Sequence, residues 1–177
     1  MIRTDRLTLR NWRDTDRDSF AALNADPEVM KDLGGPLDRT ESDAKFARYV
    51  VAFERHGFCR WVLEDANGQF LGYTGVMRSR HGHPLGPHAD IGWRLARSAW
   101  GRGYATEAAR ASLRDAFERG RSQEVFAYTS ADNMRSQAVI KRLNMQRAPS
   151  FDYSEPLVAG VWHGMAWIAR PGEADRS

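Results

Sequence analysis

A short turn with two glycines, placed between a strand-like segment and an alanine-rich helix, constrains this chain more than any other feature. The turn lies within residues 98–107 (SAWGRGYATE) and follows the strand-like residues 91–95. Gly101 and Gly103 lack a Cβ, so backbone N–H groups there can approach an anion closely. The start of a helix adds unpaired N–H donors and the positive end of the helix dipole. The arrangement therefore predicts a binding site for a phosphate group.

Two other phosphate-binding patterns do not match this turn. A Walker A loop requires a lysine after its second conserved glycine, and no lysine follows here. The dinucleotide fingerprint requires a small residue three positions after its second glycine, and that position is Thr106. Threonine fits poorly where a helix must pack closely on a strand.

The size and composition of the chain are those of a single globular domain. The 177 residues are 42% hydrophobic, which suffices for one packed core. No apolar run reaches the ~18 residues that span a bilayer, and residues 1–13 lack the apolar core of a secretory signal. Cys59 is the only cysteine, which excludes an internal disulfide and fits a reducing compartment. We therefore expect a cytoplasmic protein with one domain, residues 1–170, and a polar tail, residues 171–177.

The charge distribution argues against a nucleic-acid partner. The formal net charge is +3, from 26 basic and 23 acidic residues, and the arginines are spread along the whole chain. A nucleic-acid-binding surface normally has clustered basic residues. The mildly positive balance can still attract a smaller polyanion.

Hydrophobic periodicity and turn residues predict a mixed α/β domain. Strands are predicted at residues 6–10, 59–64, 70–78, 89–96, 125–129, 148–153 and 161–170. Helices are predicted at residues 14–24, 40–56, 103–120 and 133–143, with a further helical turn from Asp26. This order fits a single sheet that is covered by helices on both faces.

Turn and cap residues mark several boundaries of these elements. Thr40 and Asp43 have the spacing of a capping box that opens a helix, and Gly57 fits the C-terminal cap of that helix. Asn67-Gly68 predicts a hairpin turn between two strands. Asn144 stands where a left-handed cap is expected, a conformation that asparagine tolerates.

The glycine turn resembles the pyrophosphate loop of the GNAT superfamily of acetyl-CoA-dependent N-acetyltransferases. That loop reads Gln/Arg-x-x-Gly-x-Gly/Ala, and its last two fixed positions correspond to Gly103 and Ala105. Its first position falls on Trp100, which departs from the pattern. The run from Trp100 to Ala108 (WGRGYATEA) is similar to the branch of ribosomal-protein N-terminal acetyltransferases, the RimJ/RimL-like branch.

Further segments extend the resemblance over nearly the whole chain. Residues 133–145 are similar to the family's Asn-x-x-Ser helix, in which Asn144 replaces the usual glycine of the closing Leu-Gly-Met or Leu-Gly-Phe. Residues 6–10 and 163–170 also resemble this branch. The resemblance implies the GNAT fold, a single mixed and mostly antiparallel central sheet that is splayed and has helices on both faces.

The resemblance also implies acetyl-CoA as co-substrate. In the family, the pantetheine arm lies in the gap beside the strand that precedes the loop, where backbone groups from Trp93 to Leu95 would pair with it. The N–H of Leu95 is the candidate donor to the oxyanion, and Asn133 would hydrogen-bond the pantetheine arm. The residues expected to hold the pyrophosphate are Gly101, Arg102, Gly103, Tyr104, Ala105 and Thr106.

Two side chains are candidates for proton transfer. Ser136 lies one helical turn after Asn133, and this branch often has a serine where other members use a tyrosine to protonate the leaving thiolate. The alternative for Ser136 is a hydrogen bond to its own helix backbone. Asp90, at the start of the strand before the loop, is a candidate base for the amine, directly or through water. The alternatives for Asp90 are a substrate-binding charge and a solvated strand end.

The loop at residues 79–88 contains three histidines, His81, His83 and His88, which raises the alternative of a metal site. No cysteine or carboxylate stands at ligand spacing from them, so we expect no metal. The alternative is a flexible loop beside the active site.

Together these features predict an N-acetyltransferase that moves an acetyl group from acetyl-CoA to a primary amine by direct attack in a ternary complex. The acceptor is a protein N-terminus or a small-molecule amine. One rival is a non-catalytic, regulatory acetyl-CoA-binding module, and another is a nucleic-acid-binding domain. We expect neither a nucleic-acid nor a membrane partner, and the oligomeric state stays open, with a homodimer as one alternative.

Overall fold

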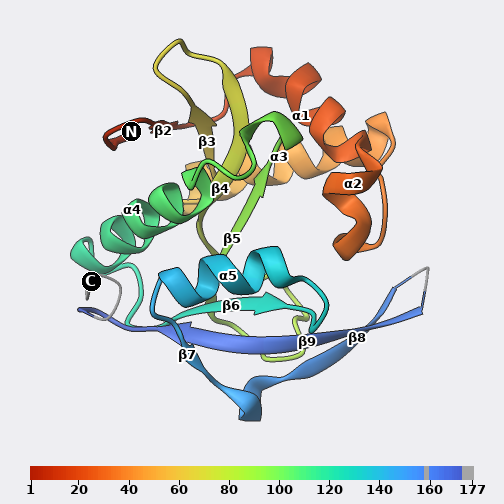
Figure 1. The fold of residues 1–177 in the computed structure, drawn as a ribbon, viewed down its shortest axis with the longest axis vertical. Coiled ribbons are helices and arrows are strands. Elements are labelled where there is room, and N and C mark those ends of the chain that lie inside the picture. Colours follow the sequence, from red (N-terminus) through yellow and green to blue (C-terminus); the bar gives the residue numbers. More distant parts are fainter. Residues whose placement is uncertain (158–159, 173–177) are drawn as a thin grey trace.

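The computed structural model describes residues 1–157 and 160–172, and one mixed sheet organises them (Figure 1). The strands follow the order β1-β2-β3-β4-β5-β6-β9-β7, and β8 pairs with β9 beside this path. Their bounds are β1 Ile2–Arg3, β2 Thr8–Arg10, β3 Trp61–Glu64, β4 Phe70–Arg78, β5 Ala89–Leu95, β6 Val125–Thr129, β7 Gln146–Arg147, β8 Tyr153–Leu157 and β9 Gly160–Ala169. Every pairing is antiparallel except that of β5 with β6, which confirms the predicted mixed, mostly antiparallel sheet.

The parallel contact between β5 and β6 is the narrowest point of the sheet. It consists of one register pair, Asp90 with Phe126, whereas seven register pairs join β4 to β5. Beyond that point the two strands diverge, and β1 to β5 form one half of the molecule while β6 to β9 form the other (Figure 1). The crossover that parallel strands require is α4 (Tyr104–Glu118). The sheet is therefore splayed on the C-terminal side of β5.

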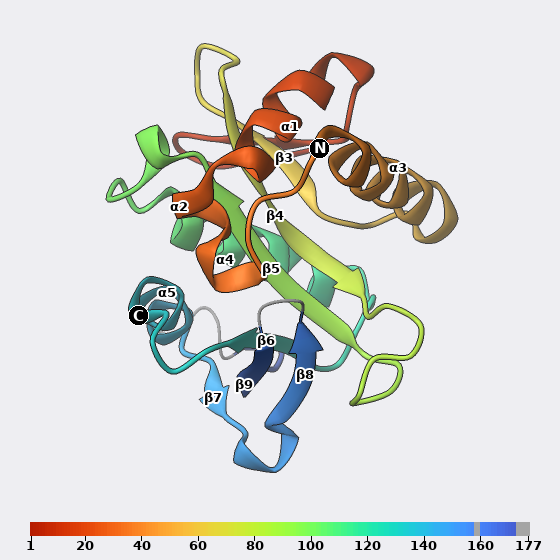
Figure 2. The same ribbon diagram turned by 90° about the vertical axis from the view of Figure 1, so that its right-hand side faces the viewer.

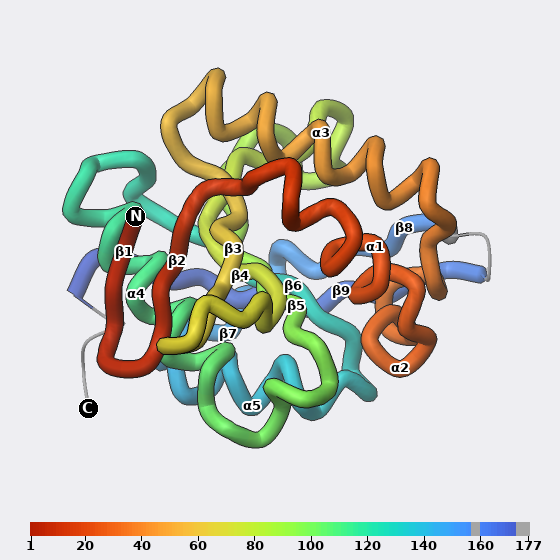
Figure 3. The backbone as a smooth tube through the Cα atoms, turned by 90° about the horizontal axis from the view of Figure 1, so that it is seen from above, coloured from red at the N-terminus to blue at the C-terminus, as the bar shows by residue number. Residues whose placement is uncertain are grey.

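Helices cover both faces of the sheet, as predicted. The helices α1 (Arg17–Ala25), α2 (Pro27–Met30) and α3 (Arg39–His56) belong to one layer, and α4 and α5 (Met134–Arg142) belong to the other. Figure 3 shows α3 and α5 on opposite sides of the strands. Four short 3-10 helices complete the described part of the chain: η1 Asp14–Asp16, η2 Lys31–Leu33, η3 Arg97–Ala99 and η4 Pro149–Phe151.

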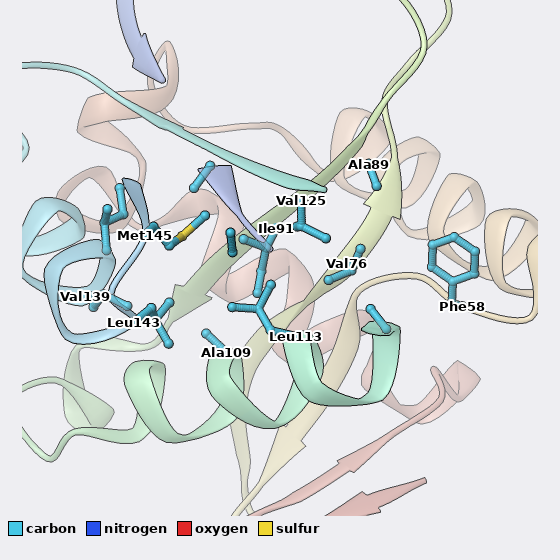
Figure 4. Close-up of a cluster of buried hydrophobic side chains, with 14 residues drawn as sticks. Phe58, Val76, Ala89, Ile91, Ala109, Leu113, Val125, Val139, Leu143 and Met145 are labelled. Carbon is cyan, nitrogen blue, oxygen red and sulfur yellow. The ribbon is translucent and has the colours of Figure 1, made fainter. Parts of the chain in front are cut away.

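Each layer has its own hydrophobic core because successive strand residues point to opposite faces of a sheet. On the α1–α3 side, Phe20 and Phe46 pack with Tyr73 of β4. On the α4–α5 side, Leu113 and Ile91 meet in the cluster drawn in Figure 4. The two cores fix the sheet from both sides, and a third buried cluster contains Leu95 at the end of β5 and Ala108 of α4.

Several predicted boundaries are confirmed. The strands β4 and β6 have the predicted bounds. Gly57 ends α3 with a φ of 71°, and Asn144 follows α5 with a φ of 54°, so both adopt the expected left-handed conformation. Asn67-Gly68 lies in the turn between β3 and β4.

The capping box of α3 lies two residues earlier than predicted. The Asp38 carboxylate accepts from the N–H of Glu41 at 2.8 Å, and the Glu41 carboxylate accepts from the N–H of Asp38 at 2.9 Å. The predicted pair, Thr40 and Asp43, lies inside the helix, where Asp43 binds Arg39. Because Asp38 already satisfies the free N–H donors, the helix begins at Arg39.

The predicted strand at residues 148–153 is wrong. Pro149 has no N–H and a fixed φ, so the chain turns there as η4 and leaves two short strands, β7 and β8, on either side. Asp152 anchors this turn, since its carboxylate accepts from the N–H of Ala166 at 2.9 Å and pairs with Arg147 at 2.5 Å.

Within residues 1–157 and 160–172, no helix has both the length and the apolar character needed to cross a membrane. Of the polar tail predicted from residue 171 onward, residues 173–177 lie outside the described part of the chain.

A buried ion cluster joins β2 to β3 and to the start of α1. The Arg10 guanidinium donates to both carboxylate oxygens of Asp16, at 2.8 and 2.7 Å, and to Glu64 at 2.7 Å. Only 7% of the Arg10 side chain and 5% of the Asp16 side chain are exposed. Removing one partner would leave a buried charge without compensation, which is strongly destabilising.

We expect Arg10→Met to lower the free energy of unfolding by about 3–5 kcal/mol, measured by urea denaturation. The matched control is Arg39→Met, which removes an exposed guanidinium paired with Asp18 and Asp43 and should leave the midpoint nearly unchanged. Equal midpoints for the two variants would show that the cluster does not stabilise the fold.

Candidate functional site

The glycine turn presents unpaired backbone donors. Gly101 and Gly103 have φ angles of 74° and 77°, a left-handed conformation that residues with a Cβ disfavour. Gly103 is the N-cap of α4, and no side chain caps the first turn of this helix. A Cβ built on Gly101 would meet no atom within 4 Å, so the turn borders open space. The free N–H groups and the helix dipole are thus available to an anion.

Arg6 stabilises this turn through hydrogen bonds. Its Nη1 donates to the carbonyl of Arg102 at 2.9 Å, and its Nε donates to Glu107 at 2.7 Å. Thr4 adds a hydroxyl donor to Glu107 at 2.5 Å, and the Arg6 guanidinium lies 4.8 Å from the centre of the Tyr104 ring. The segment before β2 therefore fixes the shape of a turn that lies far away in the sequence.

The last part of β5 has an unpaired edge. The N–H of Ala96 donates to the carbonyl of Leu71 on β4 at 2.9 Å. Alternate residues of a strand direct their N–H and C=O groups to opposite edges, so Trp93 and Leu95 direct theirs away from β4. On that side the ladder to β6 ends at Asp90. The Leu95 carbonyl accepts from the indole N–H of Trp100 at 2.8 Å, which leaves the Leu95 N–H facing the gap.

The glycine turn, this strand edge and the start of α5 surround one pocket of about 440 Å³. Nine of the predicted site residues line it: Trp93, Leu95, Gly101, Gly103, Tyr104, Ala105, Thr106, Asn133 and Ser136. Val29, Asp32 and Leu33 add a wall from the α2 and η2 segment, which lies over β5 in Figure 2. Arg102 is exposed at the turn and does not line the pocket.

The start of α5 brings two polar side chains into this pocket. Asn133 is the N-cap of α5, and its Oδ1 accepts from the N–H of Ser136 at 3.0 Å. The Asn133 Nδ2 and the Ser136 hydroxyl form no hydrogen bond with any described residue. Ser136 is half-buried and lines the pocket, so its hydroxyl is available to a ligand.

Trp100, which departs from the loop pattern, carries a cation on its face. The Arg135 guanidinium of α5 lies 4.0 Å from the centre of the Trp100 ring. Arg135, Arg94 and Arg142 line the pocket, against the single carboxylate of Asp32. The pocket wall is therefore positive, which favours a polyanionic ligand.

Asp90 is not brought into this pocket. Its carboxylate is in an ion pair with Arg60, and the Arg60 Nη1 also donates to the Asp90 carbonyl at 2.8 Å and to the Gly75 carbonyl. Only 9% of the Arg60 side chain is exposed. The Asp90 carboxylate is therefore held within the fold by Arg60, away from the pocket.

The histidine-rich loop packs on aromatic rings. The Nδ1 of His88 lies 2.8 Å from the Gly86 carbonyl and its Nε2 lies 2.5 Å from the Tyr128 hydroxyl, while the ring of His83 stacks on Tyr128. Within the described ranges, no group of three or more His, Cys, Asp or Glu residues is arranged to hold a metal ion. The loop is thus anchored against β6.

The Acetyltransferase (GNAT) domain family matches residues 6–146 of the chain. Uncharacterized protein YkkB of Bacillus subtilis (strain 168) is 32% identical over 145 residues, which cover 80% of this chain and 83% of that protein. The FsC-acetyl coenzyme A-N(2)-transacetylase of Aspergillus fumigatus (strain ATCC MYA-4609 / CBS 101355 / FGSC A1100 / Af293) is 31% identical over 157 residues. That match covers 85% of this chain and 66% of the Aspergillus protein, just under two thirds of its length.

Solved structures share the fold. The acetyltransferase from Agrobacterium tumefaciens str. C58 superposes with a TM-score of 0.80 and 27% identity, covering 96% of this chain and 93% of that one. Mycobacterium smegmatis RimJ in complex with CoA-disulfide has a TM-score of 0.73 over 97% of this chain and 85% of its own, and its 21% identity shows a common fold alone. The splayed sheet and its glycine turn define an acetyltransferase domain. More particularly, the chain belongs to the GNAT acetyltransferase family and is an N-acetyltransferase of EC class 2.3.1.

The contact between Glu107 and the segment before β2 makes a pH-dependent contribution to stability. Burial raises the pKa of Glu107, but hydrogen bonds from Thr4 and Arg6 outweigh burial and hold it below its ordinary value of 4.5. A lowered carboxyl pKa stabilises the fold above that ordinary value, and the stabilisation is lost as the pH falls through the folded-state pKa.

We expect Glu107→Gln to lower the free energy of unfolding by about 1–2 kcal/mol near neutral pH, where the charged hydrogen bonds are intact. The difference from the wild type should shrink at about pH 3, in urea denaturation run at both pH values. Glu118→Gln, at the exposed end of α4, serves as the control. A Glu107→Gln difference that is the same at both pH values would contradict the role of the charge.

Proposed function

We propose that this N-acetyltransferase binds acetyl-CoA in the pocket formed by the glycine turn, the unpaired edge of β5 and the start of α5. The observation that carries the proposal is the convergence of three separate segments, each with unpaired polar groups, on one positive pocket. Two similar proteins support the same ligand class, since one is an acetyl coenzyme A transacetylase and the other forms a complex with CoA-disulfide. Residues 1–170 form the proposed catalytic domain.

The proposed binding mode follows the chemistry of coenzyme A. Its pyrophosphate is held by the N–H groups of residues 101–106, and Arg135, stacked on Trp100, supplies the positive charge that the family's first loop position would otherwise carry. Backbone groups of Trp93 and Leu95 bind the pantetheine arm along the free strand edge. The Asn133 Nδ2 donates to a carbonyl of that arm, while its Oδ1 keeps α5 capped.

The proposed reaction is direct attack of a neutral amine on the acetyl thioester. The nitrogen forms a C–N bond, the oxyanion accepts from the Leu95 N–H, and the C–S bond then breaks. Ser136 donates its hydroxyl proton to the departing thiolate and regains one from water. The amine proton passes to water. Asp90 supports the site indirectly, because its ion pair with Arg60 stabilises the point where the sheet divides.

The first test of this mode replaces Gly103. Gly103→Asp sets a carboxylate against the pyrophosphate, and like charges in contact cost several kcal/mol, so acetyl-CoA should bind about 100-fold more weakly or worse in calorimetry. Gly103→Asn is the matched control, because asparagine has the same size and also tolerates the left-handed conformation. Equal acetyl-CoA affinities of the Asp and Asn variants would show that the pyrophosphate does not bind at this turn.

The second test concerns the thiolate. Ser136→Ala should lower kcat about 100-fold in a thiol-release assay, because it removes a proton donor, and it should change the acetyl-CoA Kd little. Ser112→Ala is the control, since Ser112 is a buried serine of α4 whose hydroxyl bonds the Ala108 carbonyl. An unchanged kcat for Ser136→Ala would exclude Ser136 from proton transfer. Tight acetyl-CoA binding without transfer to any amine would support the non-catalytic alternative.

A further inference from the structure

Arg94 is a cation in the pocket wall that has no anionic partner among the described residues. Its Nη1 donates to the Asn24 Oδ1 at 3.2 Å and to the Met30 Sδ at 3.0 Å, and both of these acceptors are neutral. Its Nε is buried and forms no hydrogen bond within the described part of the chain. The side chain nevertheless lines the pocket. Arg94 lies on β5 between Trp93 and Leu95, so it projects from the opposite face of the strand.

Two buried arginines of this chain show what is unusual about Arg94, which is itself half-buried. Arg10 binds the carboxylates of Asp16 and Glu64, and Arg60 binds the carboxylate of Asp90. A guanidinium removed from water requires such a partner, because the loss of hydration is otherwise not compensated. For Arg94 the described residues supply hydrogen-bond acceptors but no carboxylate, so a carboxylate partner can come from a ligand.

A second cation, Lys45, shares the Asn24 Oδ1 with Arg94 as its hydrogen-bond acceptor. The Lys45 Nζ is 3.4 Å from the Asn24 Oδ1, and it lies 5.7 Å from the centre of the Tyr73 ring, which Arg94 also faces at 5.6 Å. Burial is the main cause that lowers the pKa of Lys45, to about 8. Burial raises the pKa of Tyr73, but Arg94 and Lys45 outweigh burial and lower it to about 7. The lowered pKa of Tyr73 indicates a positive potential around its ring, whereas the shift of Lys45 comes mainly from burial.

The same pocket contains one carboxylate, that of Asp32 on η2. Asp32 forms no ion pair with any residue in the ranges 1–157 and 160–172, and it is half-buried at the pocket wall. Val29 and Leu33 on the same segment add apolar surface. This wall of the pocket thus combines the cation of Arg94 and the anion of Asp32 with the apolar surface of Val29 and Leu33. Neither charge forms an ion pair with a described residue.

We infer that the acceptor is a small amine that carries a carboxylate, as a free amino acid does, and that Arg94 binds this carboxylate while Asp32 attracts the amine. This inference rests on the proposed acetyl transfer in the same pocket. A guanidinium binds a carboxylate with two parallel hydrogen bonds from neighbouring N–H donors. A protein N-terminus has an amide where the amino acid has its carboxylate, so it lacks the group that Arg94 requires.

The test compares free amino acids with their amides. Thiol release from acetyl-CoA is measured with L-leucine, L-methionine and L-phenylalanine and with the three corresponding carboxamides. The wild type should have a kcat/KM about 10-fold or more higher for the acids, because the amides leave the half-buried guanidinium unpaired. Arg94→Gln should abolish this preference, mainly through KM for the acids, and Arg94→Lys should retain part of it because it keeps the charge.

Two further variants separate specificity from folding. Asp32→Asn, on the half-buried η2, should raise KM for the acids severalfold and needs no rearrangement of the core. Arg39→Gln removes a distant exposed arginine and is the charge-matched control, so it should keep the preference of the wild type. The far-ultraviolet circular dichroism spectrum of Arg94→Gln should match that of the wild type, which excludes a general loss of structure.

The failure of this inference differs from the failure of the proposed function. Calorimetric titration of the protein with L-leucine and with L-leucinamide tests the Arg94 site directly, with and without coenzyme A. Loss of acetyl-CoA binding would contradict the proposed function, while a preference for L-leucine that depends on Arg94 would still support this inference. Equal binding or acetylation of acids and amides, or a preference that Arg94→Gln leaves unchanged, would overturn it and leave Tyr73 as the partner of Arg94.

Discussion

The single pairing between β5 and β6 is the constraint on which the rest of this structure depends. Only Asp90 and Phe126 are in register, so the two halves of the sheet meet at one point and diverge from it. Arg60 stabilises that point, because its guanidinium binds the carboxylate and the carbonyl of Asp90 together with the Gly75 carbonyl of β4. The divergence exposes the edge of β5 at Leu95, and α4 must begin beside this edge because it is the crossover to β6.

Polar groups in this protein fall into two classes that explain where the site lies. Structural charges are paired within the fold, as Arg10 is with Asp16 and as Arg6 is with Glu107. Around the pocket, the described residues offer no partner to the N–H donors at the start of α4, to the Ser136 hydroxyl or to the Arg94 Nε. Polar groups without a partner in the fold are available to a ligand, and their position around one pocket supports a ligand that completes their hydrogen bonds.

Local features of the sequence predicted much of this arrangement. The glycine turn before the long helix and the left-handed cap at Asn144 depend on backbone preferences of single residues, and the structure has both where they were predicted. Boundaries were less certain where two cap signals compete, as Asp38 and Thr40 do at the start of α3. The strand predicted across Pro149 disregarded a signal that was present, since proline cannot donate to a ladder.

The sequence by itself determined the order of most elements, the glycine turn before α4 and the resemblance to the GNAT family, because these rest on short-range patterns. Only the tertiary structure decided which charges neutralise one another. Asp90 has the residue type of a base, yet packing places Arg60 against it, and Arg94 has the residue type of a surface charge, yet packing places it in the pocket with neutral neighbours. The strength of an ion pair depends on distance and burial in three dimensions, and neither quantity is encoded in local sequence spacing.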